Sequence, residues 1–267
     1  TGRSSPTFVE MPMIHWPDNM LTYVAEQKIA FSNDAFGQHI ASYDIFDDAH
    51  GAAKCIDRAK DYYANIVMPY GMQVANKLKQ IQEMKLDIDM IAPAHGIIWR
   101  SYLPELFQAY EDFATFKAVD KAVIVYESVW KHTQMMAEAL AEGMGRNGIC
   151  VKIFKCSMTS PAIIQKELLD AKAILVGSGN YNNAMAGSIA AFLEKLVTCK
   201  VKNKKGLGFG SYGWANLVTK EINARLEKAG ITLLNDTVVS QNYTPSEEDL
   251  DALMELGKQI AEEIKAM

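Results

Sequence analysis

The second half of the chain alternates short apolar runs with stretches of helical periodicity. Short continuous apolar runs are typical of strands buried on both faces. We predict strands over 121–126, 150–154, 173–177 and 206–210, with a last strand region over 231–234 and 237–240. Apolar residues recur at i, i+3 and i+4 between them, which predicts helices over 133–144, 161–169, 187–197 and 215–229. Strands that alternate with helices in this way form a parallel, doubly wound sheet that binds ligands at the carboxyl ends of its strands.

The final helix is expected to begin at Thr244-Pro-Ser-Glu247, interpreted as a capping box with Pro245 at the first helical position. The first part of the chain has a different pattern. We predict strands over 6–12, 21–25 and 28–32 and helices over 52–64, 74–84 and 104–116. The change of pattern predicts two domains, 1–117 and 118–267.

Composition narrows the class of protein. Of 267 residues, 49% are apolar and 22% are charged, the balance of a globular chain rather than a disordered one. A net charge of −5 argues against nucleic acid as the main partner, and the chain has no apolar run of about 18 residues that would span a membrane. The start of the chain does not resemble a signal peptide, and its four cysteines are scattered without a Cys-x-x-Cys pair. We therefore expect reduced thiols and a cytoplasmic location.

Three residues of the first part are candidate metal ligands. His15, Asp34 and His95 each follow an apolar, strand-like run and stand beside turn-forming residues. Two imidazoles and a carboxylate suit a first-row transition metal, although residue types alone leave a chance trio open. His39 has either a supporting role beside a ligand or a plain structural one, and His50 is expected on the solvated surface.

The loop after the strand 121–126 is a candidate anion site. It reads Glu127-Ser-Val-Trp-Lys-His-Thr133 and leads directly into a helix, whose N-terminal N–H groups and dipole attract a phosphate. The loop has neither the Walker pattern nor Gly-x-Gly-x-x-Gly, so a mononucleotide phosphate is favoured over a dinucleotide. The alternative is that Ser128 and Thr133 only cap the helix.

Two further loops are expected at the same edge of the sheet, and small residues with aromatic neighbours in them suit a planar ring. Their candidate contacts are Ser178, Asn180, Tyr181, Asn182 and Asn183 in one loop and Ser211, Tyr212, Gly213 and Trp214 in the other. Trp130 and Tyr212 could equally be ordinary packing residues.

Several of these segments resemble the flavodiiron proteins. His15-Trp-Pro-Asp18, Ser32-Asn-Asp-Ala-Phe-Gly-Gln-His39 and Ala92-Pro-Ala-His-Gly-Ile-Ile-Trp-Arg100 are similar to three metal-ligand segments of that family. The 18 residues between His15 and Asp34 and the 60 between Asp34 and His95 also agree with it. The loops of the second half resemble the family's flavin loops, but Gly179-Asn180 and Ala215-Asn216 depart from its usual residues there.

The resemblance implies a partial metallo-β-lactamase-like αββα domain followed by a flavodoxin-like sheet, an α/β protein throughout. It implies two non-haem iron ions, with His15 and His95 as terminal ligands and Asp34 as a bridge. It also implies one FMN, contacted by Ser128, Val129, Trp130, His132 and Thr133 and by the two further loops. The family's segment His-x-Glu-x-Asp-His does not occur here, so we expect either a truncated molecule or a companion chain that supplies it.

The activity implied by the resemblance is that of an oxidoreductase. Electrons would pass from FMN to the diiron site, where dioxygen is reduced to water or nitric oxide to nitrous oxide. The implied assembly is a head-to-tail homodimer or a tetramer, in which the flavin of one protomer faces the metal site of its partner. The electron donor would be separate, either a rubredoxin-like protein or a reduced deazaflavin or nicotinamide system.

Two other functions are weighed against this one. One is a flavodoxin-like electron-transfer protein with an incomplete, inactive metal domain, favoured by the missing His-x-Glu-x-Asp segment. The other is a hydrolase that uses metal-bound hydroxide, which the second half disfavours because hydrolysis has no use for a flavin.

Overall fold

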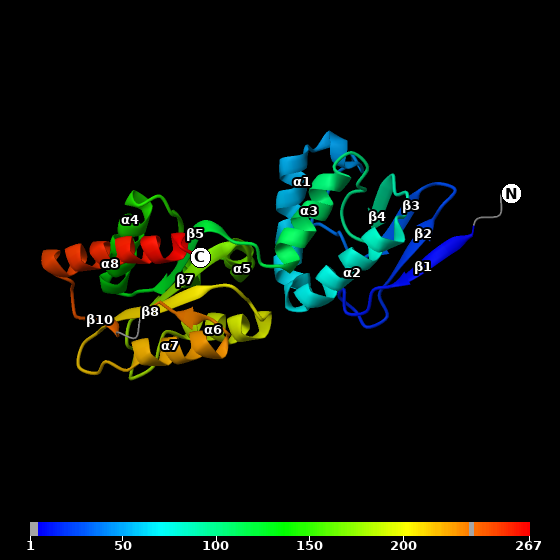
Figure 1. Cartoon of the computed structure of the whole chain (residues 1–267). Coiled ribbons are helices and arrows are strands. Elements are labelled where there is room, and N and C mark those ends of the chain that lie inside the picture. The colour runs from blue at the N-terminus through cyan, green and yellow to red at the C-terminus, as the bar shows by residue number, and fades with distance from the viewer. Residues whose placement is uncertain (1–4, 235–237) are drawn as a thin grey trace. The chain divides into compact units, whose positions relative to one another are not determined.

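The computed structural model describes residues 5–234 and 238–267. The chain divides into two compact units, Thr1–Lys117 and Ala118–Met267 (Figure 1). Within the described ranges, no helix combines the length and the apolar character that crossing a membrane requires.

The first unit is built on a four-stranded sheet in the order β1-β2-β3-β4. Its strands are β1 (Pro6–Glu10), β2 (Met20–Val24), β3 (Ile29–Asn33) and β4 (Met90–Pro93). The first two pairs are antiparallel and the pair β3–β4 is parallel. Because side chains alternate along a strand, one face of the sheet buries Val9, Leu21, Tyr23, Ala30 and Ile91.

The helices of the first unit lie to one side of this sheet (Figure 1). They are α1 (Ala52–Tyr62), α2 (Gly71–Met84) and α3 (Leu103–Ala114). A π-helical turn over Tyr63–Val67 and a 3-10 turn over Met68–Tyr70 join α1 to α2, and another 3-10 turn spans Asp47–Ala49. Aromatic rings fill the space between helices: Tyr63 packs edge-on against Tyr110 at 5.4 Å between ring centroids.

The second unit is built on a parallel sheet in the order β10-β8-β7-β5-β6, with β9 also paired to β8. Its strands are β5 (Val119–Glu127), β6 (Cys150–Lys155), β7 (Ala171–Ser178), β8 (Lys205–Tyr212), β9 (Thr232–Leu233) and β10 (Val239–Asn242). Without the two-residue β9, the strands of this unit follow the order 2-1-3-4-5 of flavodoxin-like folds. In that order the chain continues from β5 toward one edge of the sheet and from β7 toward the other. The loops that follow β5 and β7 therefore diverge and leave a crevice at the carboxyl ends of these strands.

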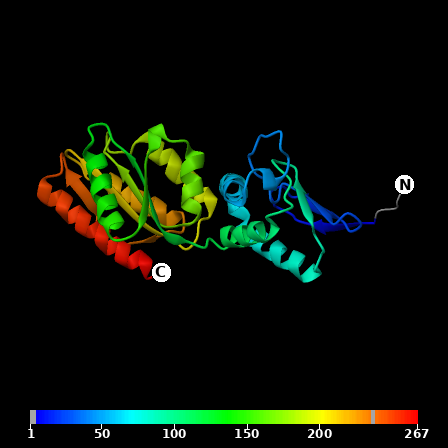
Figure 2. The same ribbon diagram turned by 90° about the horizontal axis from the view of Figure 1, so that it is seen from above.

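Helices cover both faces of the second sheet, with α4 and α8 on one side and α6 and α7 on the other (Figure 1). The helices are α4 (His132–Arg146), α5 (Pro161–Leu169), α6 (Gly187–Cys199), α7 (Val218–Lys228) and α8 (Glu247–Lys265), with a 3-10 turn over Cys156–Met158. Figure 2 shows α8, in red, beside α4, in green. A Cβ on Gly143 would lie 2.0 Å from the Met254 carbonyl oxygen, so this close approach requires glycine.

The structure confirms the predicted strands and helices, with three corrections to helix starts. The helix predicted from Val74 begins at Gly71. Ser246, not Thr244, caps α8: its hydroxyl accepts from the Asp249 N–H at 3.2 Å, and the Asp249 carboxylate accepts from the Ser246 N–H at 2.9 Å. The predicted helix from Ala215 begins instead at Val218. Of the last strand region, residue 237 lies outside the described residues.

Candidate functional site

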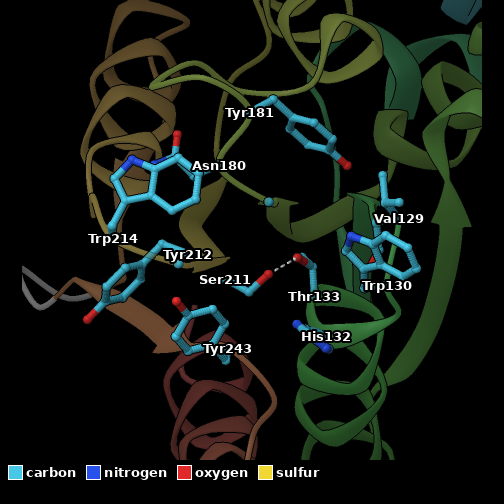
Figure 3. Close-up of a pocket in the computed structure, with 13 residues that line it drawn as sticks. Val129, Trp130, His132, Thr133, Asn180, Tyr181, Ser211, Tyr212, Trp214 and Tyr243 are labelled. Carbon is cyan, nitrogen blue, oxygen red and sulfur yellow. Dashed lines mark hydrogen bonds between the residues drawn. The ribbon is translucent and has the colours of Figure 1, made fainter.

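The loops after β5, β7, β8 and β10 surround a cavity of about 450 Å³ in the second unit (Figure 3). A volume of this size is within the range of small-molecule sites. The cavity is lined by Ser128, Val129, Trp130, His132, Thr133, Gly179, Asn180, Tyr181, Ser211, Tyr212, Gly213, Trp214 and Tyr243. The carboxyl ends of parallel strands meet at one edge of the sheet, which is why four distant segments contribute to it.

One end of the cavity is formed by the start of α4. Lys131 precedes the helix with φ of 66°, and this turn leads into His132 and Thr133. Thr133 Oγ1 and Ser211 Oγ lie 2.8 Å apart, so a hydrogen bond joins two of the loops (Figure 3). His132 Nε2 is 3.0 Å from the hydroxyl of Thr244. Hydroxyls, an imidazole and the N-terminal amides of a helix together suit a phosphate group.

The rest of the cavity suits a flat, partly polar ring. Asn180 donates its side-chain N–H to the Ala215 carbonyl, while its Oδ1 is buried and accepts no hydrogen bond from the described part of the protein. A buried acceptor without a donor costs free energy, so it fits a ligand that brings an N–H group. Trp130 and Trp214 stand at opposite sides of the opening, and both are mostly exposed (Figure 3). These features fit the flavin expected from the sequence.

Three of the predicted contact residues lie outside the cavity lining. Ser178 is buried beneath it, where its hydroxyl donates to the Gly179 carbonyl at 2.8 Å and accepts from the Ala186 N–H at 3.0 Å. Asn182 and Asn183 have φ of 50° and 64° and form a tight turn. Such a turn is favoured by asparagine, and the backbone groups of Tyr181 and Ala184 close it with hydrogen bonds of 2.8 and 2.9 Å.

Two residues of the lining were missed in the sequence: Gly179 and Tyr243. Gly179 immediately follows β7, and Tyr243 immediately follows β10. Ligands bind beyond the carboxyl ends of parallel strands, and this rule applied to every predicted strand would have pointed to Gly179 and Tyr243.

Glu127, at the end of β5, holds the loop that follows this strand in place. Its carboxylate accepts hydrogen bonds from the Ser157 N–H and the Ser188 hydroxyl, both at 3.0 Å, and from the Ser128 N–H at 3.2 Å. Partial burial works against the charge, but these hydrogen bonds outweigh it and lower the pKa of the Glu127 carboxyl. Glu127 therefore stays ionised and links the loops after β5 and β6 to the start of α6.

In the first unit, the structure brings His15, Asp34 and His95 together. His15 Nε2 lies 3.4 Å from Asp34 Oδ2, and His95 Nε2 lies 3.2 Å from Asp34 Oδ1. A metal ion binds imidazole nitrogen and carboxylate oxygen at about 2.0–2.2 Å. Two such donor atoms on the same ion therefore lie about as far apart as these nitrogen and oxygen atoms do. Each carboxylate oxygen thus has its own imidazole, which fits a bridge between two metal ions. In the described chain, no group of three or more His, Cys, Asp or Glu side chains surrounds a single metal position.

Tyr62, which the sequence did not single out, lies beside this cluster. Its ring centroid is 5.8 Å from that of His95 and 5.1 Å from that of His39. Its hydroxyl is buried and has no hydrogen-bond partner among the described residues. Burial, and after it the negative charge of Asp34, raises the pKa of the Tyr62 phenol, so it remains a neutral donor. His39 is exposed, and His50 contacts the Asp44 carbonyl at 2.9 Å.

Both units match known protein families. The flavodoxin family matches residues 124–257, and the ODP family beta lactamase matches residues 3–96. The chain is 44% identical over 263 residues to a nitric oxide reductase of Moorella thermoacetica, covering 98% of this chain and 66% of that protein. It is 34% identical to an anaerobic nitric oxide reductase flavorubredoxin of Escherichia coli, covering 95% of this chain and 53% of the relative.

Solved structures agree with these matches. Rubredoxin oxygen:oxidoreductase from Desulfovibrio gigas aligns with a TM-score of 0.95 and 34% identity over 99% of this chain and 66% of its own. The flavodiiron protein from Giardia intestinalis also aligns with a TM-score of 0.95, at 26% identity, over 99% of this chain and 65% of its own. The chain therefore spans at most 66% of the length of these relatives.

Proposed function

The chain belongs to the flavodiiron protein family, and on that premise we propose that it passes electrons from FMN to a non-haem diiron site. Dioxygen is reduced there to water, or nitric oxide to nitrous oxide. The observation that carries the proposal is the pairing of His15 and His95 with separate oxygens of Asp34, in a chain that also holds a flavin-sized cavity. When bound, FMN and iron supply the electron-transfer and reduction chemistry, while the protein sets their position and surroundings.

The residues of the cavity have distinct tasks in this proposal. Thr133 and Ser128, with His132, hold the phosphate at the start of α4, where the helix dipole favours an anion. Asn180 offers its unpartnered Oδ1 to a ring N–H. The aromatic side chains around the opening cover the apolar faces of the ring and exclude water from it.

In the first unit, Asp34 supplies a negative charge that offsets two cations, and His15 and His95 each supply one imidazole nitrogen as a donor. The Tyr62 phenol keeps its proton and lies beside His95, where it could donate a hydrogen bond to a ligand held in the metal site. These roles rest on the residue types and on their observed convergence.

The FMN assignment is tested by Thr133→Ala. Loss of a hydrogen bond to a charged group costs about 1.5–3 kcal/mol, so FMN affinity should fall about 10- to 100-fold. Fluorescence quenching during titration of apoprotein with FMN measures the change. Thr198→Ala is the matched control, because exposed Thr198 donates its hydroxyl to the Lys195 carbonyl on α6 and does not line the cavity. Unchanged affinity in Thr133→Ala would remove Thr133 from the phosphate site.

A companion segment is the second part of the proposal. The face of the β1–β4 sheet opposite the helices exposes Phe8 by 59% and Phe31 by 49%, and both pair with Thr22 in register. A hollow of about 410 Å³ on this face is lined by Asp18, Met20, Thr22, Phe31, Asn33, Ala92, Pro93 and Ala94. Asn33 and Ala94 directly adjoin the ligands Asp34 and His95. A second sheet on this face would therefore end at the metal cluster.

We assign this face to a β-sheet-forming segment that carries the remaining carboxylate and imidazole ligands. The matched relatives are longer than this chain by enough to include such a segment. Adding a polypeptide that contains His-x-Glu-x-Asp should raise iron content to about two per chain, because both coordination shells are then completed.

The contact should depend on the exposed aromatic side chains. Burying a phenylalanine contributes about 1.5–3 kcal/mol, so Phe31→Ser should weaken association about 10- to 100-fold in a calorimetric titration. Ile163→Ser is the control, since Ile163 is exposed on α5 of the other unit. Equal association of both variants with the companion would rule out this face.

Two partners complete the proposal. The first is a second copy of the chain in a head-to-tail dimer, which brings the flavin of one protomer to the metal site of its partner. The second is a separate electron donor of the rubredoxin type, since related proteins are a flavorubredoxin and a rubredoxin oxygen:oxidoreductase.

A flavodoxin-like electron-transfer protein is the second candidate. It is favoured by the finding that the described residues surround no single metal position with three ligands. An iron assay after the companion has been added separates the two functions, because an electron carrier would bind FMN and remain free of iron.

A further inference from the structure

The metal-binding side chains stand on turns beyond the edge of the first sheet, where strand pairing no longer holds them. The pairing of β3 with β4 ends at Asn33 and Pro93, and directly after it the Ala94 N–H donates to the Asn33 carbonyl at 2.7 Å. Asp34 follows Asn33 in one segment, and His95 follows Ala94 in the other. Some other contact must therefore keep their turns at a constant separation.

The buried side chain of Gln38 makes that contact. Its Nε2 donates to the Ile97 carbonyl at 3.0 Å, and its Oε1 accepts from the Ile97 N–H at 2.7 Å. The Gln38 backbone N–H also donates to the His95 carbonyl at 3.2 Å. A Cβ on Gly96 would lie 1.7 Å from Gln38 Oε1, so the glycine at φ of 89° lets the two turns approach this closely.

We infer that Gln38 is a positioning residue for the metal site: it fixes the distance between the Asp34 and His95 turns. This inference rests on the proposed function. The amide satisfies both backbone groups of Ile97, as a neighbouring strand would, and a carboxylate in its place would leave the Ile97 carbonyl without a donor. An amide is also neutral, so it adds no charge beside the cluster and competes poorly for the metal.

The His15 turn has its own support, independent of Gln38. Asn19 is buried and donates to the Ile14 carbonyl, and its Oδ1 accepts from Asn33 Nδ2 at 2.6 Å. Gln38 thus acts on the pair formed by Asp34 and His95, whereas Asn19 acts on the pair formed by His15 and Asp34. This separation makes the role of Gln38 specific enough to test.

The test uses the full chain supplied with its companion segment, and Co²⁺ as the only metal, with binding followed by the visible absorption of the bound ion. Gln38→Met keeps the length of the side chain but removes its amide. We expect Co²⁺ affinity to fall about 10- to 100-fold, the usual effect of removing a group that orients a metal ligand. In the metal-free chain, hydrogen exchange at the Ile97 N–H should become faster, because that N–H loses its acceptor.

A purely structural role is excluded by a double-mutant comparison. In the His95→Ala background, Gln38→Met should leave the remaining Co²⁺ affinity unchanged, whereas in the His15→Ala background it should keep its full effect. Asn223→Leu is the control for lost stability, since buried Asn223 likewise accepts a backbone N–H, that of Gly208 at 2.7 Å, in the other unit. It should lower the denaturation midpoint without changing Co²⁺ affinity.

The possible failures are distinguishable. If the unchanged chain binds Co²⁺ no better than Asp34→Ala, the proposed metal site is wrong and this inference falls with it. If the unchanged chain binds and Gln38→Met binds equally well, only the positioning role is wrong. An equal loss in the His15→Ala and His95→Ala backgrounds would also overturn it, because the effect would then not pass through His95.

Discussion

Asp34→Ala is expected to abolish iron binding in the protein supplied with its companion segment. The carboxylate has an imidazole at each oxygen, so its removal takes one donor from both metal positions at once. Removing a mere supporting group costs about 10- to 100-fold in metal affinity, and loss of a shared ligand should exceed that range. Elemental analysis of iron per chain measures the result.

Asp112→Ala is the matched control for that experiment. Asp112 is a carboxylate of the same unit on α3, where it pairs with Lys117 at 3.1 Å, and it does not line the hollow assigned to the companion segment. Iron content in this variant should equal that of the unchanged protein. Full iron content in Asp34→Ala would contradict the bridging role.

Restored activity in mixed dimers is the second large effect that we expect. Asp34→Ala keeps its flavin cavity and loses its metal site, while Ser211→Trp fills the cavity and keeps the metal ligands. Both parents should be inactive. In a head-to-tail dimer, each mixed dimer contains one intact flavin–metal pair across the two protomers. Random exchange makes about half of the dimers mixed, so about one quarter of the unchanged activity should return.

The measurement is anaerobic flavin reduction followed by oxygen or nitric oxide consumption, with the companion segment present. Before mixing, each parent is checked for its remaining cofactor and for its size in solution. Mixed dimers that form and stay inactive, while both parents retain their remaining cofactor, would show that electrons do not cross between protomers.

Much of the fold could be predicted from local patterns. The apolar run at 173–177 is buried in β7, and the helix predicted over 161–169 has the bounds of α5. Such predictions succeed because burial on both faces of a strand, or on one face of a helix, leaves its period in the sequence. The start of α8 was misplaced because Thr244 and Ser246 both have the chemistry of a cap. The reciprocal bonds between Ser246 and Asp249 make Ser246 the cap, while Thr244 instead contacts His132.

The candidate site divides in the same way. The family resemblance of three segments, together with their spacing, singled out His15, Asp34 and His95, and the sequence by itself determined which turn carries each of them. Their convergence on separate oxygens of one carboxylate was decided by the packing of β1–β4, since no local pattern reports a distance across 60 intervening residues.

The tertiary structure alone decided which neighbours support these groups. The sequence places Tyr62 on a helix and Gln38 in a loop, but it does not show their neighbours. In the structure Tyr62 lies beside His95, and Gln38 bonds to Ile97, 59 positions away. Asn182 and Asn183 have suitable side chains for a flavin contact but do not line the cavity, whereas Tyr243, near the C-terminal end of the chain, does. The sequence encodes periodicity and residue chemistry within a segment. Strand order and register decide which segments meet, and these depend on the packing of the whole unit.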